Sequence, residues 1–501
     1  MSINFDLFDR FEALTFDDVV VIPGFSETLP DEVDTTATFA ADIELAVPLV
    51  SAAMDKVTEA RMAIAMARCG GIGVIHRNMS IADQASEVQK VKRSQSGMIT
   101  DPVTLPPTAL LHEAEALMNR FKFSGVPITD DEGQLVGILT NRDIRFCEGP
   151  DFDRPVTDFM TSDRLVTAAV GTSLDEAKLL LQEHRIEKLP LVDGAGCLAG
   201  LITVKDIQKR LDFPNASRDG KGRLRCAAAI GVGADVEERV DALVTMGVDA
   251  VSIDTAHGHS ANVIKTIERI KGTWPELAVT AGNVVTEDGV GALAKAGADA
   301  VKVGVGAGSI CTTRVVSGAG MPQLSAIYFA SKRAEKMGIP IIGDGGITFS
   351  GDIVKAITAG AETVMLGSLL AGVEESPGEM ELFEGRRYKS YRGMGSMGAM
   401  TGDSQDRYAT GQSSSSKGAA GTASQKLVPE GIEGRVPFSG PLGDVAYQLV
   451  GGLRSGMGYA GAASLSQLRS AKMMRVTTAG RQESHPHDVT ITKEAPNYQR
   501  S

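Results

Sequence analysis

Eight short apolar segments with β-strand character recur along this chain, and sequences with helical periodicity separate most of them. Their apolar residues run on without the polar alternation of a half-exposed strand, which is typical of a parallel sheet buried on both faces. Eight strand–helix units predict an α/β fold, a (β/α)8 TIM barrel. The predicted strands are Leu45–Ala53, Gly71–His76, Cys226–Val232, Asp249–Asp254, Leu277–Gly282, Ala300–Val305, Ile339–Gly343 and Thr363–Leu366.

An internal repeat interrupts this pattern after the second predicted strand. Residues 97–146 and 160–211 match at a constant offset of 63 positions, so that Gly125-Val126-Pro127-Ile128 corresponds to Lys188-Leu189-Pro190-Leu191. We therefore predict a barrel in two parts, 1–93 and 215–501, with an inserted module at 94–214. The repeat resembles a tandem pair of CBS domains, which typically bind adenine or guanine nucleotides between the copies. A purely structural insert is the alternative.

Polar or glycine-rich sequence follows five of the predicted strands. Because the active site of such a barrel lies at the carboxyl ends of its strands, these positions are candidate site residues. Phosphate often binds after the last two strands, where paired glycines and a serine would offer N–H groups and a hydroxyl. Plain βα turns are the alternative for each glycine pair. The positions are Asp254, Asn283, the loop Gly304–Cys311, Asp344 with Gly345-Gly346, and Gly367-Ser368.

The loop from Gly304 to Arg314 reads Gly-Val-Gly-Ala-Gly-Ser-Ile-Cys-Thr-Thr-Arg. Three alternating glycines disfavour helix and strand and indicate a backbone that must approach something closely. Cys311 lies beside an arginine and open N–H groups, which are the surroundings of a low-pKa nucleophile. A buried cysteine beside a tight turn is the alternative. As a dinucleotide-binding fingerprint the glycine run is weak, because no helix clearly opens on it.

Composition and charge exclude several classes. The 501-residue chain carries a net charge of −13, which disfavours nucleic-acid binding because phosphate contacts need a basic patch. Its five cysteines are scattered and form no Cys-x-x-Cys pair, as expected in a reducing cytosol. No apolar run could span a membrane and no signal peptide is evident, so we expect a cytoplasmic protein. A metal site from His257, His259, His485 and His487 lacks further ligands at a suitable spacing.

Two segments near the C-terminal end of the predicted barrel lack a core pattern. Residues 388–400 are rich in glycine and methionine and predict a loop. Residues 401–425 are polar and serine-rich, which predicts a mobile flap. This flap carries Asp406-Arg407-Tyr408, so it is either a passive linker or a lid that brings Arg407 and Tyr408 to the site.

Several of these motifs together resemble the inosine-5′-monophosphate (IMP) dehydrogenase family. The resemblance extends from Leu14-Thr15-Phe16-Asp17-Asp18 to Glu483-Ser484-His485 and covers nearly the whole chain. Two departures are Ala53, where the family commonly has proline, and the serine-rich flap. The matching motifs are the cysteine loop, Asp344-Gly345-Gly346, Tyr391-Arg392-Gly393-Met394-Gly395, Asp406-Arg407-Tyr408 and Pro429-Glu430-Gly431.

The resemblance implies a reaction and a set of residues for it. Cys311 would attack C2 of the hypoxanthine ring of IMP, hydride would pass to NAD, and the thioimidate would be hydrolysed to xanthosine monophosphate (XMP). Arg407, with Tyr408, would activate the water, or Arg407 would orient it while Thr313 and Glu430 pass the proton on. Implied nucleotide-binding residues are Ser309, Asp344, Gly345, Gly346, Gly367, Ser368, Tyr391, Arg392, Gly393, Met394, Gly395 and Glu430. Implied NAD-binding residues are Asp254, Gly304, Val305 and Gly306.

The family also implies a potassium ion and a homotetramer. Potassium would be held by backbone carbonyls of Gly306, Gly308 and Cys311, and by those of Glu483, Ser484 and His485 from a neighbouring subunit. Carbonyl ligands leave no side-chain signature in a sequence.

Two other functions compete with this one. A guanosine monophosphate (GMP) reductase shares the barrel and the cysteine loop but uses NADPH for a deamination and lacks the Arg-Tyr pair of the flap. A nucleotide-sensing regulatory protein with an inert barrel is opposed by the intact Cys311, Asp344 and Arg407.

Overall fold

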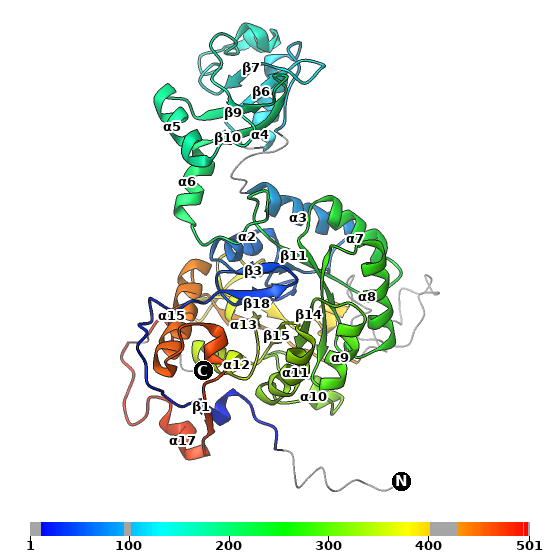
Figure 1. Cartoon of the computed structure of the whole chain (residues 1–501), viewed down its shortest axis with the longest axis vertical. Helices are drawn as coiled ribbons and strands as arrows, with labels where there is room; N and C mark the ends of the chain where they lie inside the picture. Colours follow the sequence, from blue (N-terminus) through cyan, green and yellow to red (C-terminus); the bar gives the residue numbers. More distant parts are fainter. Residues whose placement is uncertain (1–11, 95–101, 122, 401–427, 494, 499–501) are drawn as a thin grey trace. The chain divides into compact units, whose positions relative to one another are not determined.

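The computed structural model describes residues 12–94, 102–121, 123–400, 428–493 and 495–498. The chain divides into two compact units, both visible in Figure 1. The first comprises Met1–Ser94, Asn215–Ser217 and Leu224–Ser501, and the second comprises Gln95–Pro214 and Arg218–Arg223. No helix within the described ranges combines the length and the apolar character needed to cross a membrane.

The first unit is built on a closed, all-parallel barrel of eight strands, as the sequence predicts. The strand order around the barrel is β11-β12-β13-β14-β15-β16-β4-β5, so the two strands before the inserted unit close the ring formed by the six after it. The strands are β4 (Leu49–Ser51), β5 (Ile72–Ile75), β11 (Ala227–Ile230), β12 (Ala250–Asp254), β13 (Ala278–Val284), β14 (Ala300–Val303), β15 (Ile341–Asp344) and β16 (Thr363–Leu366).

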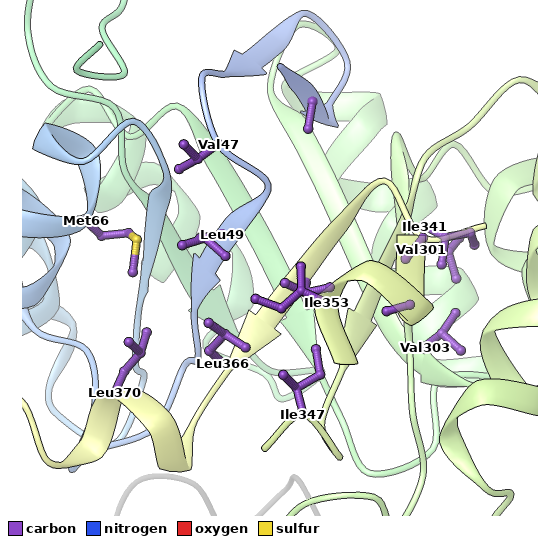
Figure 2. Close-up of a cluster of buried hydrophobic side chains, with 14 of the residues drawn as sticks. Val47, Leu49, Met66, Val301, Val303, Ile341, Ile347, Ile353, Leu366 and Leu370 are labelled. Atoms are coloured by element: carbon purple, nitrogen blue, oxygen red, sulfur yellow. The ribbon is translucent and has the colours of Figure 1, made fainter. Parts of the chain in front are cut away.

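Helices surround the barrel, and alternate strand residues face them. Figure 2 shows this outer layer, in which Leu49, Val301 and Leu366 from strands pack with Met66 and Ile353 from helices. Each such side chain, when fully buried, contributes roughly 1.5–3 kcal/mol. The helices are α2 (Ala60–Arg68), α3 (Ile81–Ser94), α7 (Val236–Thr245), α8 (Ala261–Thr273), α9 (Glu287–Lys295), α11 (Gln323–Met337), α12 (Ser350–Thr358) and α15 (Leu442–Ala460).

A second, separate cluster of buried side chains fills the inside of the barrel. It combines small residues, such as Ala227, Ala250 and Ala278, with larger ones, such as Ile342 of β15 and Met365 of β16. Because side chains alternate between the two faces of a strand, the neighbouring residues point to the helices. The inner layer is therefore narrow and packed rather than a pore.

A three-stranded antiparallel sheet extends the chain beyond the barrel. It consists of β17 (Met380–Phe383), β18 (Arg386–Arg392) and β19 (Glu433–Pro437), in that order. The loop predicted for residues 388–400 is therefore wrong at both ends, because β18 ends at Arg392 and the short helix α14 (Met397–Met400) occupies the last four positions. The charged and aromatic residues of β18 pair on both sides, with Glu381 opposite Tyr388 and Arg435 opposite Ser390. Cross-strand pairing thus stabilises a segment that has no apolar pattern.

The second unit repeats one set of elements at an offset of 63 residues. Helix α4 (Leu111–Phe121) corresponds to α5 (Leu174–His184). The hairpin of β6 (Gly125–Thr129) and β7 (Leu135–Thr140) corresponds to that of β9 (Lys188–Val192) and β10 (Leu198–Thr203). The two copies hydrogen-bond to each other through Leu135 N to Gly196 O and Leu198 N to Gly133 O. The sequence repeat is thus also a structural repeat, while its assignment to CBS domains stays a prediction.

The copies are not identical at their contact. Lys188 occupies the position of Gly125 in the first copy, and its Nζ lies 2.7 Å from Ser124 Oγ of that copy. Burial lowers the pKa of Lys188, and the charge of Glu187 opposes this shift.

We predict that replacing residues 94–214 with a short linker leaves catalysis intact. The barrel closes through β5 and β11 without any strand of the second unit, so its fold does not need that unit. The measurement is kcat and KM of the deletion variant beside the full chain, with circular dichroism to show that it is folded. A folded variant without activity would show that the second unit contributes to the site.

Candidate active site

A cavity lies at the carboxyl ends of the barrel strands, where the sequence places the candidate residues. Loops after five strands and Asn283 of β13 form its wall, together with segments next to β18 and β19. The cavity is lined by Ala52, Met54, Thr255, Ala256, Asn283, residues 304–311, Thr313, residues 344–347, residues 365–368, Tyr391, Gly393, Met394, Gly395 and Glu430.

The cavity contains most of the predicted site residues. All of the predicted glycines line it, and so do Cys311, Thr313, Asp344 and Glu430. Asp254, Arg392, Glu483, Ser484 and His485 do not line it. The predicted flap at 401–425, with Arg407 and Tyr408, lies outside the described residues.

Gly304 shows why the cysteine loop begins with glycine. Its φ is +148°, and a Cβ there would lie 2.1 Å from the backbone oxygen of Asp344. Gln323 holds the same two segments together, because its Nε2 donates to the carbonyls of Val303 (2.8 Å) and Asp344 (3.0 Å). The chain after β14 thus packs directly on the chain after β15, which only glycine permits.

Cys311 lies at one end of a chain of hydrogen bonds that runs through Thr313 to Glu430. Its Sγ lies 3.2 Å from Thr313 Oγ1, and Thr313 Oγ1 donates to Glu430 Oε2 at 2.8 Å. Backbone bonds hold the two segments together, from Thr312 N to Glu430 O (3.0 Å) and from Ile432 N to Ile310 O (3.0 Å). A thiol, a hydroxyl and a carboxylate therefore form a continuous path along which a proton can move.

Cys69 and Cys226 do not share this environment. Cys226 is buried in the outer core, and Cys69 packs against that core. Burial, with a contribution from Glu375, raises the pKa of Cys69 to about 11, so its thiol stays protonated at neutral pH. Cys311 is the cysteine that lines the cavity.

Arg314 has a role that the sequence did not indicate. Its guanidinium donates to the carbonyl oxygens of Val305 (3.1 Å) and Met321 rather than to a side chain of the cavity. A Cβ on Gly306 or Gly320 would collide with the Arg314 side chain, which explains both glycines. Burial lowers the pKa of Arg314. Arg314 thus stabilises the cysteine loop by a hydrogen bond to its backbone.

Tyr391 closes one side of the cavity. Its hydroxyl lies 3.8 Å from Met54 Sδ, and a Cβ on Gly367 would lie 2.9 Å from the same hydroxyl. Burial raises the pKa of Tyr391 well above its usual value, against the lowering effect of a hydrogen bond with Ser309. The phenol therefore remains a hydrogen-bond donor throughout the physiological pH range. Met54 is a lining residue that carried no sequence signal.

The predicted phosphate site has the expected backbone. Gly345 and Gly346 have φ of +97° and +79°, so both adopt conformations that favour glycine. Ser368 begins the short helix α13 (Ser368–Ala371) directly after β16. Backbone N–H groups and a hydroxyl thus line the same cavity as Cys311, which suits a phosphate monoester.

Asp344 is held by a buried network. Its Oδ2 accepts hydrogen bonds from Lys302 Nζ (2.8 Å) and Asn283 Nδ2 (2.9 Å). Lys302 also donates to Asp254 Oδ1 at 3.0 Å and to Asn283 Oδ1. Asp254 is 3% exposed and lies below the cavity, so its predicted contact with a dinucleotide stays a prediction. The sequence analysis missed Lys302, although a lysine within an apolar strand was a visible signal.

Arg392 was predicted to bind the nucleotide, but its side chain is engaged elsewhere. Its Nε and Nη2 both donate to Asp55 Oδ2, which also accepts from Asn78 Nδ2. This carboxylate is buried, and its hydrogen bonds raise the pKa of Arg392. The Arg392 guanidinium thus pairs with the buried carboxylate of Asp55 instead of lining the cavity. This ion pair holds in place the segment that carries Gly393 and Met394.

The residues predicted to serve a neighbouring subunit lie at the end of helix α17 (Thr478–Glu483). The imidazole of His485 lies near Phe349 and Tyr498, and its carbonyl contacts His487 Nδ1 at 2.9 Å. Within the described part of the chain, no three His, Cys, Asp or Glu side chains gather as a metal site.

Fold and cavity together define a (β/α)8-barrel enzyme with a cysteine at the mouth of the barrel. A family model described as the IMP dehydrogenase / GMP reductase domain matches residues 13–487, so the chain belongs to this family. It is 58% identical to the inosine-5′-monophosphate dehydrogenase of Aquifex aeolicus, over 97% of this chain and 98% of that protein. It is 55% identical to the Bacillus subtilis protein of the same name, at the same coverage.

A solved structure of the second activity in the family is also similar. A GMP reductase variant from Trypanosoma brucei, in complex with guanosine 5′-monophosphate, matches with a TM-score of 0.87 and 39% sequence identity. The match covers 97% of this chain and 100% of that chain. Fold alone therefore does not separate the two activities.

We predict that Gly304→Ala destabilises the protein and weakens nucleotide binding. Strain at positive φ costs about 1–3 kcal/mol, and the new Cβ would displace the Asp344 backbone. Thermal unfolding and calorimetric titration with IMP measure the two effects. Gly308→Ala is the matched control, because its Cβ would meet only Cys311 Cβ at an ordinary 3.6 Å. Equal melting temperatures for the two variants would contradict the close packing at Gly304.

Proposed function

We propose that this protein is an IMP dehydrogenase, which oxidises IMP to XMP with NAD in the committed step of guanine nucleotide synthesis. The Cys311–Thr313–Glu430 path in the cavity carries the proposal, since it joins a nucleophile to a proton acceptor. The two relatives named inosine-5′-monophosphate dehydrogenase, 55% and 58% identical over nearly the full length, support it.

In the first step the chain supplies the nucleophile and holds the nucleotide. Cys311 Sγ loses its proton and bonds to C2 of the purine, and the hydride from C2 departs. NAD, when bound, accepts that hydride. Gly304, Val305 and Gly306 are assigned to the dinucleotide because they line the cavity on the loop that carries Cys311. Asp344 would accept from the ribose hydroxyls.

The remaining nucleotide contacts follow the walls of the cavity. We assign the phosphate to backbone N–H groups and hydroxyls, the purine to the segment after Tyr391, and the purine edge to Glu430. Arg392 is kept in this set only through its backbone, since its guanidinium pairs with Asp55. The contacting residues are Ser309, Gly345, Gly346, Gly367, Ser368, Tyr391, Arg392, Gly393, Met394, Gly395 and Glu430.

In the second step a water attacks the thioimidate carbon, the carbon–sulfur bond breaks, and XMP leaves. We assign activation of that water to Arg407 with Tyr408. A guanidinium is effectively always protonated, so a neutral Arg407 is a minor species. The alternative is that Arg407 orients the water while Thr313 passes its proton to Glu430, a path of 2.8 Å between the two oxygens.

The proposal includes an ion, an assembly and a regulatory ligand. Backbone carbonyls suit potassium because hard cations prefer oxygen, and Gly306, Gly308 and Cys311 lie on one loop. Glu483, Ser484 and His485 would complete the site from the next subunit of a homotetramer. Purine nucleotides would bind the repeated unit, and the protein would act in the cytoplasm.

GMP reductase is the second candidate, favoured by the similarity to the Trypanosoma brucei structure. The same cysteine would attack C2 of GMP, but NADPH would deliver hydride and ammonia would leave. Incubation with IMP and NAD, and separately with GMP and NADPH, distinguishes the two by the rise or fall of absorbance at the nicotinamide band.

We predict that Cys311→Ala abolishes NADH formation while IMP still binds. The variant removes the only thiol that lines the cavity among the described residues and leaves the walls in place. NADH absorbance and calorimetric titration with IMP measure the two properties. Cys69→Ala is the control and should keep its activity. Turnover by Cys311→Ala close to that of the unsubstituted protein would rule out the covalent mechanism.

We predict that Arg407→Ala separates the two steps. Hydride transfer needs Cys311, IMP and NAD, so the variant should release about one NADH per site in a burst and then stall. Mass spectrometry of the quenched protein should find the nucleotide on Cys311. Arg407→Lys should restore little, because a compact ammonium lacks the planar fork. Loss of the burst itself, with IMP still bound, would place Arg407 before hydrolysis.

A further inference from the structure

A lysine lies inside the barrel, directly beneath the cavity. On β14 the flanking residues Val301 and Val303 belong to the outer core, so Lys302 between them points inward. Its side chain is 1% exposed, and it does not line the cavity. Lys302 therefore does not touch a ligand there, and its effect on the site has to pass through its neighbours.

Three strand ends converge on this ammonium group. Lys302 Nζ donates to Asp254 Oδ1 at the end of β12 (3.0 Å), to Asn283 Oδ1 in β13, and to Asp344 Oδ2 at the end of β15 (2.8 Å). A buried ammonium is costly unless it is paired and fully hydrogen-bonded. Here all three of its protons have an oxygen acceptor, so the geometry is fixed from three sides.

The two carboxylates depend on the lysine in return. Asp254 and Asp344 both approach the same nitrogen, and without its charge the two carboxylates would repel each other. A displaced Asp344 would be a poorer acceptor for two ribose hydroxyls. Lys302 thus keeps Asp344 in place.

Asp344 is the member of this cluster that reaches the cavity. Its side chain is 20% exposed, and both Lys302 and Asn283 donate to Oδ2. Within the described residues no hydrogen bond to Oδ1 occurs, so this oxygen remains available to a ligand. One oxygen of the carboxylate is anchored in the barrel and the other is presented to the site.

We propose that Lys302 is a positioning residue that sets the orientation of Asp344 for nucleotide binding. This inference rests on the proposed function, because it takes Asp344 as the ribose anchor. It assigns a binding role to a residue that makes no contact with the ligand. Asn283 contributes to the same positioning, because it hydrogen-bonds to both Lys302 and Asp344.

The test is a double-mutant cycle on IMP binding. Lys302→Gln is made alone and together with Asp344→Asn, and calorimetry gives the dissociation constant of IMP for each protein. Lys302→Gln should raise that constant at least about tenfold, the effect of losing a charge-assisted hydrogen bond. In the Asp344→Asn background it should add less than about twofold, because the residue it acts through is already altered. KM for IMP should rise more than kcat falls, and Lys302→Arg should restore part of the affinity.

Lys92→Gln is the matched control. Lys92 is 3% exposed and pairs with Asp249 at 2.5 Å, next to the opposite end of β12. Its loss removes an equally buried ion pair from the same strand region but away from the cavity. Lys92→Gln should lower the melting temperature while the dissociation constant of IMP stays within about twofold.

Three results would overturn the proposal: an unchanged dissociation constant in folded Lys302→Gln, an equal increase in both backgrounds, or a loss of affinity in Lys92→Gln as large as that in Lys302→Gln. If Lys302→Gln does not fold, the same cycle with Lys302→Arg decides, because Lys302→Arg keeps only part of the affinity and this remaining loss should also disappear in the Asp344→Asn background. The cycle needs no turnover, so it is separate from the proposed reaction. If the unsubstituted protein binds GMP but not IMP, the cycle is run with GMP, and binding of neither nucleotide overturns the inference.

Discussion

The pairing of β5 with β11 is the interaction on which the barrel and its cavity depend. It places Val74 opposite Ala227 and Ile75 opposite Ala228, although the entire second unit lies between these strands in the chain. The other junction, β16 with β4, places Val364 opposite Leu49. Only when both junctions form do the eight strand ends share one face, and only then do Cys311 and Asp344 line the same cavity.

The division of the strands into an inner and an outer face explains how one fold is both stable and functional. The outer face carries branched aliphatic residues that bury area against helices. The inner face carries a mixed layer of small and large apolar residues, and nearer the cavity Asp254, Lys302 and Asp344 introduce charges. Hydrophobic burial outside the barrel therefore offsets the cost of desolvating charges inside it.

Much of this was predictable from the sequence, because apolar runs and fixed repeats are periodic signals. All eight predicted strands are present, and the cysteine loop, the paired glycines and Glu430 line one cavity. What the sequence did not reveal depends on three-dimensional partners. Residues 386–392 form a strand because of cross-strand pairs rather than an apolar pattern, and Arg392 turns away because Asp55 is buried beside it. Lys302 was missed because a single charged residue in a strand does not reveal which face it occupies.

The unequal halves of the second unit have a consequence for its internal symmetry. Lys188 of one copy has only Gly125 as its counterpart in the other, and it donates across the contact to Ser124 of the first copy. Exchanging the two copies would therefore not reproduce this contact, because the hydrogen bond runs in one direction only. The halves are thus no longer equivalent, although their helices and hairpins still correspond at a fixed offset.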